Sequence, residues 1–354
     1  MDDFRIDSHK LIYHLSRTNQ WLDGKNIYPI CLEIGPSGAC NQRCIFCAFD
    51  YLDYKPQFID KNILKNFLSE AAQCGVKSVL YSGEGEPLLH KEISELIVHT
   101  KEVGIDVAIT TNGVFLNDKI PRECLSSLTW LRVSLNAGTR DTYAKIHRCN
   151  PSDFNRVLEN LDYVIKIKNQ NNYSCTIGVQ LVLLPENLQE VTILATALKD
   201  RGVDYLAIKP FSPHQMSHSI IKKDFDYSDY LYLDNQLQKY SSKDFKIIFR
   251  TYTMKKIKEK KPYQRCLGLP FFANITSNGD IYTCHNFVGN EKFCYGNIYK
   301  TTFSEIWQGP RRKEILHFVA NKLDTSQCRQ ACRLDEINRY LWQLKHPPAH
   351  ANFI

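Results

Sequence analysis

Short apolar runs alternate with helical patterns over the first 212 residues of this chain, and this alternation restricts the possible folds more than any other feature. Strand-like runs occupy 27–34 (IYPICLEI), 77–82 (KSVLYS), 106–111 (DVAITT), 131–136 (LRVSLN), 176–184 (TIGVQLVLL) and 205–211 (YLAIKPF). Helical patterns lie between them at 60–74, 90–103, 116–127, 152–169 and 187–201. Strands and helices that alternate at these lengths predict βαβ units and a parallel sheet buried on both faces.

Six strands are too few to close an eight-stranded barrel, so we expect an α/β fold with a partial (β/α)6, TIM-like barrel. The functional site of such folds lies at the carboxyl ends of the strands. Beyond the barrel, cysteines return from Cys266 onward around a hairpin signal, Asn278-Gly279. We therefore predict an N-terminal helical extension (1–26), a core (27–220), a connecting segment (221–262), a small C-terminal domain (263–335) and a tail (336–354).

The composition limits location and partners. The N-terminus, MDDFRIDSHKLIYHL, lacks the apolar core of a signal peptide, and no run approaches the roughly 18 apolar residues of a membrane helix. We expect a cytoplasmic protein without a membrane partner, whose 13 cysteines stay reduced and act as metal or redox ligands. The net charge of +7 permits an anionic substrate but does not favour nucleic acid, because the basic run 255–261 is typical of a solvated helix or linker.

Three cysteines follow the first predicted strand with the spacing C-x3-C-x2-C: Cys40, Cys44 and Cys47. Three buried thiols without a function are one interpretation. A zinc site is another, but it needs a fourth ligand nearby, and the loop contains no histidine. An iron–sulfur cluster held by three thiolates leaves one iron open, and an open iron can bind a small chelating molecule. This last interpretation is favoured.

The cysteine motif, with Phe46 before its last cysteine, resembles that of the radical S-adenosylmethionine (SAM) superfamily, and the resemblance covers about residues 27 to 212. It implies that Cys40, Cys44 and Cys47 hold a [4Fe–4S] cluster whose open iron binds SAM. It also implies reductive cleavage of SAM to a 5′-deoxyadenosyl radical, which abstracts a hydrogen atom from the substrate. An external one-electron reductant such as flavodoxin or ferredoxin is then a necessary partner.

Further motifs similar to those of the family follow the later strands. SGEGEPLLH at 82–90 resembles its G-x-G-E-P segment, TTNG ends the third strand and VSLN ends the fourth. Taken alone, the glycine segment also fits an ordinary turn, and the two basic residues of YAKIHR also fit a helix surface. The resemblance implies SAM-binding roles for Phe46, Gly83, Gly85, Glu86, Asn112, Ser134, Asn136, Lys145, Arg148, Gln180 and Ile208.

A second group of cysteines lies in the C-terminal domain: Cys266, Cys284, Cys328 and Cys332. By spacing alone, four thiolates suit a complete [4Fe–4S] cluster and a structural zinc ion equally well. The segment resembles SPASM/Twitch auxiliary-cluster domains through its G-x4-C, G-N-I and E-I-W motifs, which implies a second, auxiliary [4Fe–4S] cluster. A full SPASM domain has about seven cysteines, whereas this segment has five with Cys294, so we expect the shorter Twitch form with one cluster.

The spacing of the second cysteine group resembles that of 2-deoxy-scyllo-inosamine dehydrogenase-type enzymes. The resemblance implies oxidation of a hydroxyl on a sugar, aminocyclitol or similar small polar or anionic substrate. Arg250 then corresponds to a substrate-binding arginine, although an ordinary solvated arginine is the alternative. Cys294 and Cys149 are candidate functional thiols; for Cys294 the alternatives are a buried thiol, which is favoured, and a further cluster ligand. An epimerase or a peptide-modifying enzyme is the competing hypothesis for the reaction.

Overall fold

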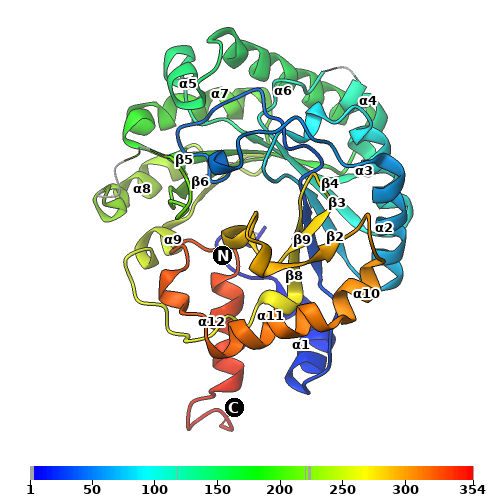
Figure 1. The fold of residues 1–354 in the computed structure, drawn as a ribbon. Coiled ribbons are helices and arrows are strands. Elements are labelled where there is room, and N and C mark those ends of the chain that lie inside the picture. The colour runs from blue at the N-terminus through cyan, green and yellow to red at the C-terminus, as the bar shows by residue number, and fades with distance from the viewer. Residues whose placement is uncertain (1–3, 118, 220, 222–224, 354) are drawn as a thin grey trace.

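The computed structural model of the chain describes residues 4–117, 119–219, 221 and 225–353. In this part of the chain, ten strands form one curved sheet that surrounds an interior, with helices on its outside (Figure 1). Their order is β10-β9-β8-β1-β2-β3-β4-β5-β6-β7. The predicted partial barrel is confirmed by six neighbouring parallel strands: β1 (Cys31–Ile34), β2 (Ser78–Tyr81), β3 (Asp106–Thr111), β4 (Leu128–Ser134), β5 (Thr176–Leu183) and β6 (Tyr205–Pro210).

Side chains alternate between the two faces of each strand, and this alternation separates the core from the barrel interior. On β4, Leu131 and Val133 are fully buried under the outer helices, whereas Trp130 and Arg132 point to the other face. The outer layer consists of α2 (Lys61–Gln73), α3 (Ile93–Glu102), α4 (Lys119–Cys124), α5 (Arg140–His147), α6 (Ser152–Asn171) and α7 (Val191–Arg201). These helices match the predicted segments, with α5 in addition.

The sheet extends beyond the six predicted strands at both edges. β7 (Lys246–Phe249) pairs in parallel with β6, although it lies in the predicted connecting segment. At the other edge, β8 (Phe272–Ile275) pairs in parallel with β1, so a strand of the predicted C-terminal domain belongs to the barrel sheet. The antiparallel strands β9 (Asp280–Tyr282) and β10 (Cys294–Asn297) follow, and Gly279 forms the predicted turn with a φ of +84°.

The remaining helices surround the two edges of this sheet. The predicted boundary at residue 220 lies outside the described residues, and the predicted tail begins with a helix. No helix in the described ranges is long and apolar enough to cross a membrane. These helices are α1 (Leu15–Leu22), α8 (Tyr232–Gln238), α9 (Thr251–Lys256), α10 (Phe303–Gln308), α11 (Pro310–Asn321) and α12 (Asp335–Lys345).

The N-terminal segment enters the centre of the barrel (Figure 1). Phe4 and Ile6 pack against Tyr205, Ala207 and Ile248, which point inward from β6 and β7. The ring centroids of Phe4 and Tyr205 lie 5.0 Å apart. Because Tyr205 is the first residue of β6, this packing covers the amino end of the barrel interior and leaves the carboxyl ends of the strands as the side where a site can form.

Candidate functional site

The loop after β1 carries the first cysteine group at the carboxyl edge of the sheet. Cys40, Cys44 and Cys47 are partly buried free thiols. The Cys47 N–H donates to the Cys44 carbonyl at 3.1 Å, which forms a tight turn between the last two cysteines. The N–H groups of Arg43 and Ile45 donate to carbonyls at the end of α5, and these bonds fix the loop against that helix.

A buried histidine on α5 contacts this loop. His147 Nδ1 lies 3.3 Å from Cys44 Sγ and 2.8 Å from Gln42 Oε1. The His147 ring stacks on Tyr143 with centroids 4.2 Å apart, and its Nε2 lies 3.2 Å from Asn136 Nδ2. Burial lowers the pKa of His147 to about 3, so the imidazole is neutral. Sequence analysis missed His147 and Gln42, because their only signal was a position near the motif residues.

The three thiols suit a cluster better than a single ion. Burial, and then the charge of Glu86, raises the pKa of Cys40 to about 12, and burial with the neighbouring Cys47 and Cys40 raises the pKa of Cys44. Thiolates that repel one another in a buried loop need a bound cation to stay ionised. In the described residues, no three His, Cys, Asp or Glu side chains are spaced for one metal ion.

The glycine segment after β2 packs directly on the cysteine loop. A Cβ on Gly85 would lie 2.3 Å from the Ser37 carbonyl oxygen and 2.4 Å from that of Ala39. Gly83 has a φ of +110°, and a Cβ there would lie 2.6 Å from the Gly35 Cα. The two glycines therefore allow two backbone segments to touch, and this contact places the segment beside the cysteines.

Glu86 and Asn112 connect this segment to β3. The buried Glu86 carboxylate accepts bonds from Thr111 Oγ1 at 2.6 Å, the Asn112 N–H at 2.8 Å and the Leu88 N–H at 3.0 Å. Asn112 Nδ2 donates to Asn41 Oδ1 in the cysteine loop at 2.7 Å. Both predicted residues thus lie at the cysteine loop, where their visible contacts hold the loop in place.

The structure brings several other predicted SAM-binding residues to the same edge. Ser134 and Gln180 are partners in the register of β4 and β5, and the Phe46 ring lies 5.7 Å from His147. Arg148 caps α5 with a φ of +48° and lines a cavity of about 150 Å³ together with Cys44.

Three predicted SAM-binding residues have side chains that are exposed on a helix, bonded to the backbone or buried in the outer core. Lys145 is exposed on α5, and the Asn136 side chain accepts from the Val182 N–H at 2.6 Å. The Ile208 side chain is part of the outer core, and its carbonyl accepts from the Arg250 N–H at 2.9 Å. The SAM-binding roles of all these residues remain predictions.

The second cysteine group gathers from separate segments. Burial, and then the thiols of Cys332 and Cys266, raises the pKa of Cys284, and Cys328 adds to the effect. Burial and Cys332 likewise raise the pKa of Cys266 to about 12. Asn338 on α12 donates from Nδ2 to Cys266 Sγ at 3.5 Å. One buried and three half-buried thiols that interact with one another match the donor set of a complete [4Fe–4S] cluster.

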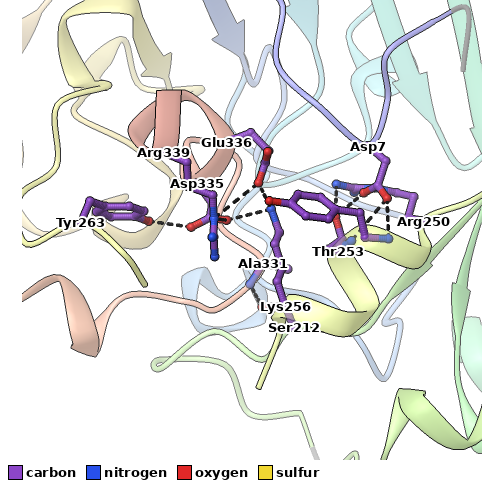
Figure 2. Close-up of polar contacts among 11 residues, drawn as sticks. Asp7, Ser212, Arg250, Thr253, Lys256, Tyr263, Ala331, Asp335, Glu336 and Arg339 are labelled. Atoms are coloured by element: carbon purple, nitrogen blue, oxygen red, sulfur yellow. Dashed lines mark hydrogen bonds and ion pairs between the residues drawn. The ribbon is translucent and has the colours of Figure 1, made fainter. Parts of the chain in front are cut away.

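The three predicted catalytic residues have different neighbours, and no contact in the described residues joins any two of them. Cys294 Sγ on β10 lies 3.5 Å from the Gly296 carbonyl, with Asp280 beside it. Cys149 Sγ lies 3.8 Å from Gln42 Nε2, near the first cysteine group. Arg250 donates from Nε to Asp7 of the N-terminal segment at 3.1 Å (Figure 2). Their catalytic roles remain predictions.

A buried polar network connects the barrel to the second cysteine group (Figure 2). Lys256 Nζ on α9 lies 2.8 Å from Asp335 at the start of α12 and also pairs with Glu336. Asp335 accepts from the Tyr263 hydroxyl at 2.7 Å and from Arg339 Nε at 3.0 Å. Lys256 belongs to the basic run predicted to be solvated, but its side chain is only 4% exposed. The Lys256–Asp335 pair thus holds α9 against the start of α12. Asp335 is three residues after Cys332, so the pair lies next to the second cysteine group.

Comparison with known proteins identifies two families along the chain. Residues 34–198 match the radical SAM superfamily, and residues 266–333 match the SPASM family, an iron–sulfur cluster-binding domain. A tungsten-containing aldehyde ferredoxin oxidoreductase cofactor-modifying protein of Pyrococcus furiosus is 24% identical over 85% of this chain and 87% of its own length. A GTP 3′,8-cyclase of Chlorobaculum tepidum is 30% identical over 52% of this chain and 55% of its own length.

A solved structure supports the same fold. The crystal structure of Streptococcus suis SuiB bound to S-adenosylmethionine superposes with a TM-score of 0.67 at 20% identity. The superposition covers 94% of this chain and 79% of SuiB.

Proposed function

We propose that this chain, which carries a radical SAM domain followed by a SPASM domain, is an enzyme that abstracts a hydrogen atom from an organic substrate and oxidises it. The observation that carries the proposal is the presence of two separate groups of free, mostly half-buried thiols in segments next to one continuous sheet. Cys40, Cys44 and Cys47 leave one iron open for SAM, and the second group of four completes an auxiliary [4Fe–4S] cluster.

SAM, held by the cluster that Cys40, Cys44 and Cys47 would bind, would supply a carbon radical able to accept a hydrogen atom. A substrate that has lost this atom beside a hydroxyl becomes a carbonyl when it releases one proton and one further electron. An external one-electron reductant such as flavodoxin or ferredoxin would supply the first electron, and an auxiliary cluster held by Cys266, Cys284, Cys328 and Cys332 would accept the last, so the electrons balance. At the amino end of the barrel, Phe4 and Ile6 cover the interior with apolar side chains.

We favour a small polar or anionic metabolite as the substrate, and one auxiliary cluster of the Twitch type. Cys294 on β10 lies beside Asp280 and Arg311. The other four cysteines of the segment interact with one another. Among the similar proteins, the Chlorobaculum tepidum enzyme is named for GTP, and a Lacinutrix mariniflava protein is an S-adenosylmethionine-dependent nucleotide dehydratase. Both names specify phosphorylated small molecules.

Peptide modification is the second candidate, and one cavity favours it. A cavity of about 290 Å³ lies between the barrel and the C-terminal segment. Apolar side chains such as Phe211, Phe225, Tyr227 and Ile257 line it, and Cys328 of the second group lies at its wall. Such a cavity suits an apolar side chain of a peptide. SuiB, which has a similar fold, has been solved bound to the precursor peptide SuiA.

The first experiment measures iron, sulfide and the EPR spectrum of anaerobically reconstituted protein, in the wild type and a Cys40/Cys44/Cys47→Ala variant. We expect about eight irons in the wild type and about four in the variant. After reduction, 5′-deoxyadenosine should form from SAM in the wild type alone. About four irons in both proteins, with no nucleoside from either, would show that the barrel cysteines hold no cluster and that the proposal is wrong.

The two substrate classes are separated by a second experiment. Phosphorylated sugars, nucleotides, aminocyclitols and peptides are added to the reduced enzyme, and the rate of 5′-deoxyadenosine formation is measured. A small metabolite that accelerates the rate and yields a carbonyl product supports the first candidate. Acceleration by peptides alone supports the second.

A further inference from the structure

The barrel interior carries more positive than negative charge. Inward positions on the strands hold Arg132 on β4 and Lys209 on β6, whose neighbours Leu131, Val133 and Ile208 are buried in the outer core. Three arginines approach from the end of β7 and from the second cysteine group: Arg250, Arg329 and Arg333. The interior therefore collects five cationic side chains from four parts of the chain.

Direct contacts show that the C-terminal arginines reach the barrel wall. Arg333 Nη1 lies 2.6 Å from Glu33 Oε2, and Glu33 points inward from β1. His285 Nε2 lies 2.9 Å from the other oxygen of Glu33. Arg329 donates to the Ser212 carbonyl, just after β6. The residues after Cys328 thus face the strands that carry Arg132 and Lys209.

Only two of the five cations have a carboxylate partner in the described part of the chain. Arg333 pairs with Glu33, and Arg250 pairs with Asp7. No ion pair within the described residues involves Arg132, Lys209 or Arg329, so no carboxylate compensates these three side chains.

Buried atoms of the two unpaired arginines also lack hydrogen bonds. Nε of Arg132 and Nε of Arg329 are both buried without a partner. Arg132 otherwise contacts Thr110 Oγ1 at 3.4 Å, lies over the Trp130 ring at 4.8 Å and interacts with the Tyr205 hydroxyl. These contacts orient the guanidinium group but do not neutralise it, so each arginine retains an unused donor.

Glu84 is the other carboxyl group near this region, and it does not supply the missing charge. Its carboxylate accepts from the Ser277 N–H at 2.7 Å. Burial raises the pKa of Glu84 to about 7, so it carries only part of a negative charge at neutral pH.

An uncompensated cluster of this kind is unfavourable for folding. Burial, and then the charges of Arg132, Arg250, Arg329 and Arg333, lowers the pKa of Lys209 to about 7. Proteins keep such arrangements at functional sites, where a ligand provides the missing charge. Guanidinium groups suit a tetrahedral or planar oxyanion because two N–H donors can bind two oxygens at once.

We propose that the barrel interior binds the substrate through a phosphoryl group held by Arg132, Lys209 and Arg329. Cationic side chains without a carboxylate partner suit a phosphate ester or a nucleotide, because a phosphoryl group carries up to two negative charges and a carboxylate only one. Arg329 directly follows Cys328, so one substrate contact lies beside the second cysteine group. The inference rests on the proposed function, because it names the substrate class of that enzyme.

The test measures binding in full-length, anaerobically reconstituted protein by isothermal titration calorimetry, with inorganic pyrophosphate as the probe and citrate as a carboxylate comparison. The variants are Arg132→Gln and Lys209→Met, and their controls are Arg156→Gln and Lys199→Met on the outer helices α6 and α7. Pyrophosphate affinity should fall about tenfold or more in each interior variant. Both control variants should bind as the wild type does.

The outcomes separate this inference from the proposed function. If the wild type does not bind pyrophosphate, if citrate binds and pyrophosphate does not, or if the interior variants bind as tightly as the controls, the inference is wrong. The iron content and the substrate-free formation of 5′-deoxyadenosine, measured on the same samples, report on the proposed function alone. Circular dichroism identifies any variant that fails to fold, and Arg132→Lys then replaces Arg132→Gln, since it keeps the charge and loses the two-point contact.

Discussion

Replacing Lys256 by methionine should destabilise the protein, because it leaves Asp335 buried without its strongest partner. The two side chains are 4% and 2% exposed, and their charged atoms lie 2.8 Å apart. Removing one member of a buried pair costs about 3–5 kcal/mol. Tyr263 and Arg339 still contact Asp335 in the variant, so we expect a loss near the lower limit, about 3 kcal/mol.

Equilibrium urea unfolding of the reduced chain, followed by tryptophan fluorescence, measures this loss. With a slope of about 3 kcal/mol per molar urea, the unfolding midpoint should fall by about 1 M. Lys258→Met is the matched control, because Lys258 lies in the same basic run and pairs with Asp226, but its side chain is 63% exposed. Exposed pairs contribute little, so the control should keep the wild-type midpoint.

The effect should also depend on pH in a defined direction. Burial alone would raise the pKa of Asp335, but Lys256 reverses this and lowers it overall. A depressed carboxyl pKa stabilises the fold above the unfolded value of about 3.9 and ceases to do so as the pH falls through the folded value. The stability gap between wild type and Lys256→Met should therefore narrow below about pH 4. Equal midpoints for Lys256→Met and Lys258→Met at pH 7 would refute the reasoning.

Three further predictions concern other residues. Gly85→Ala places a Cβ 2.3 Å from the Ser37 carbonyl oxygen and so displaces the cysteine loop from the glycine segment. The reconstituted variant should therefore hold about four irons instead of about eight. Full iron loading would contradict this contact. Lys209→Met removes a buried cation and should stabilise the reduced chain in urea by about 1 kcal/mol or more, whereas an unchanged midpoint would show that Lys209 is well solvated. Cys294→Ser should leave the iron content at the wild-type value, because this thiol lies apart from the group of four; a loss of iron would identify it as a ligand.

The strands of the barrel were predictable because buried parallel strands are continuous apolar runs, and each of the six runs overlaps a strand. β7 was missed because KIIF is a four-residue run inside a Tyr-, Asp- and Lys-rich segment. The pairing of β8 with β1 joins residues far apart in the sequence, and local patterns carry no information on such contacts.

In the candidate site, too, some residues were predictable from the sequence and others were not. The cysteines were predictable because few chemical groups other than metals require thiols at such spacing. The cationic interior was not, since its residues are single charges on different strands that only the closed sheet brings together. For Lys256 the prediction of a solvated side chain was wrong. A run of lysines that is fully solvated and a run with one buried member have the same composition, so the sequence does not distinguish them.

The parallel pairing of β8 with β1 makes the C-terminal segment a structural part of the barrel rather than an appended module. A chain shortened before β8 would leave β1 paired only with β2, so that one edge of a strand that carries Leu32 and Ile34 becomes free, and such edges promote aggregation. Enzyme engineers who exchange C-terminal segments between related proteins should therefore transfer β8 together with its partner strand. In evolution, loss of the segment that carries β8 and the second cysteine group would require another segment to cover the free edge of β1.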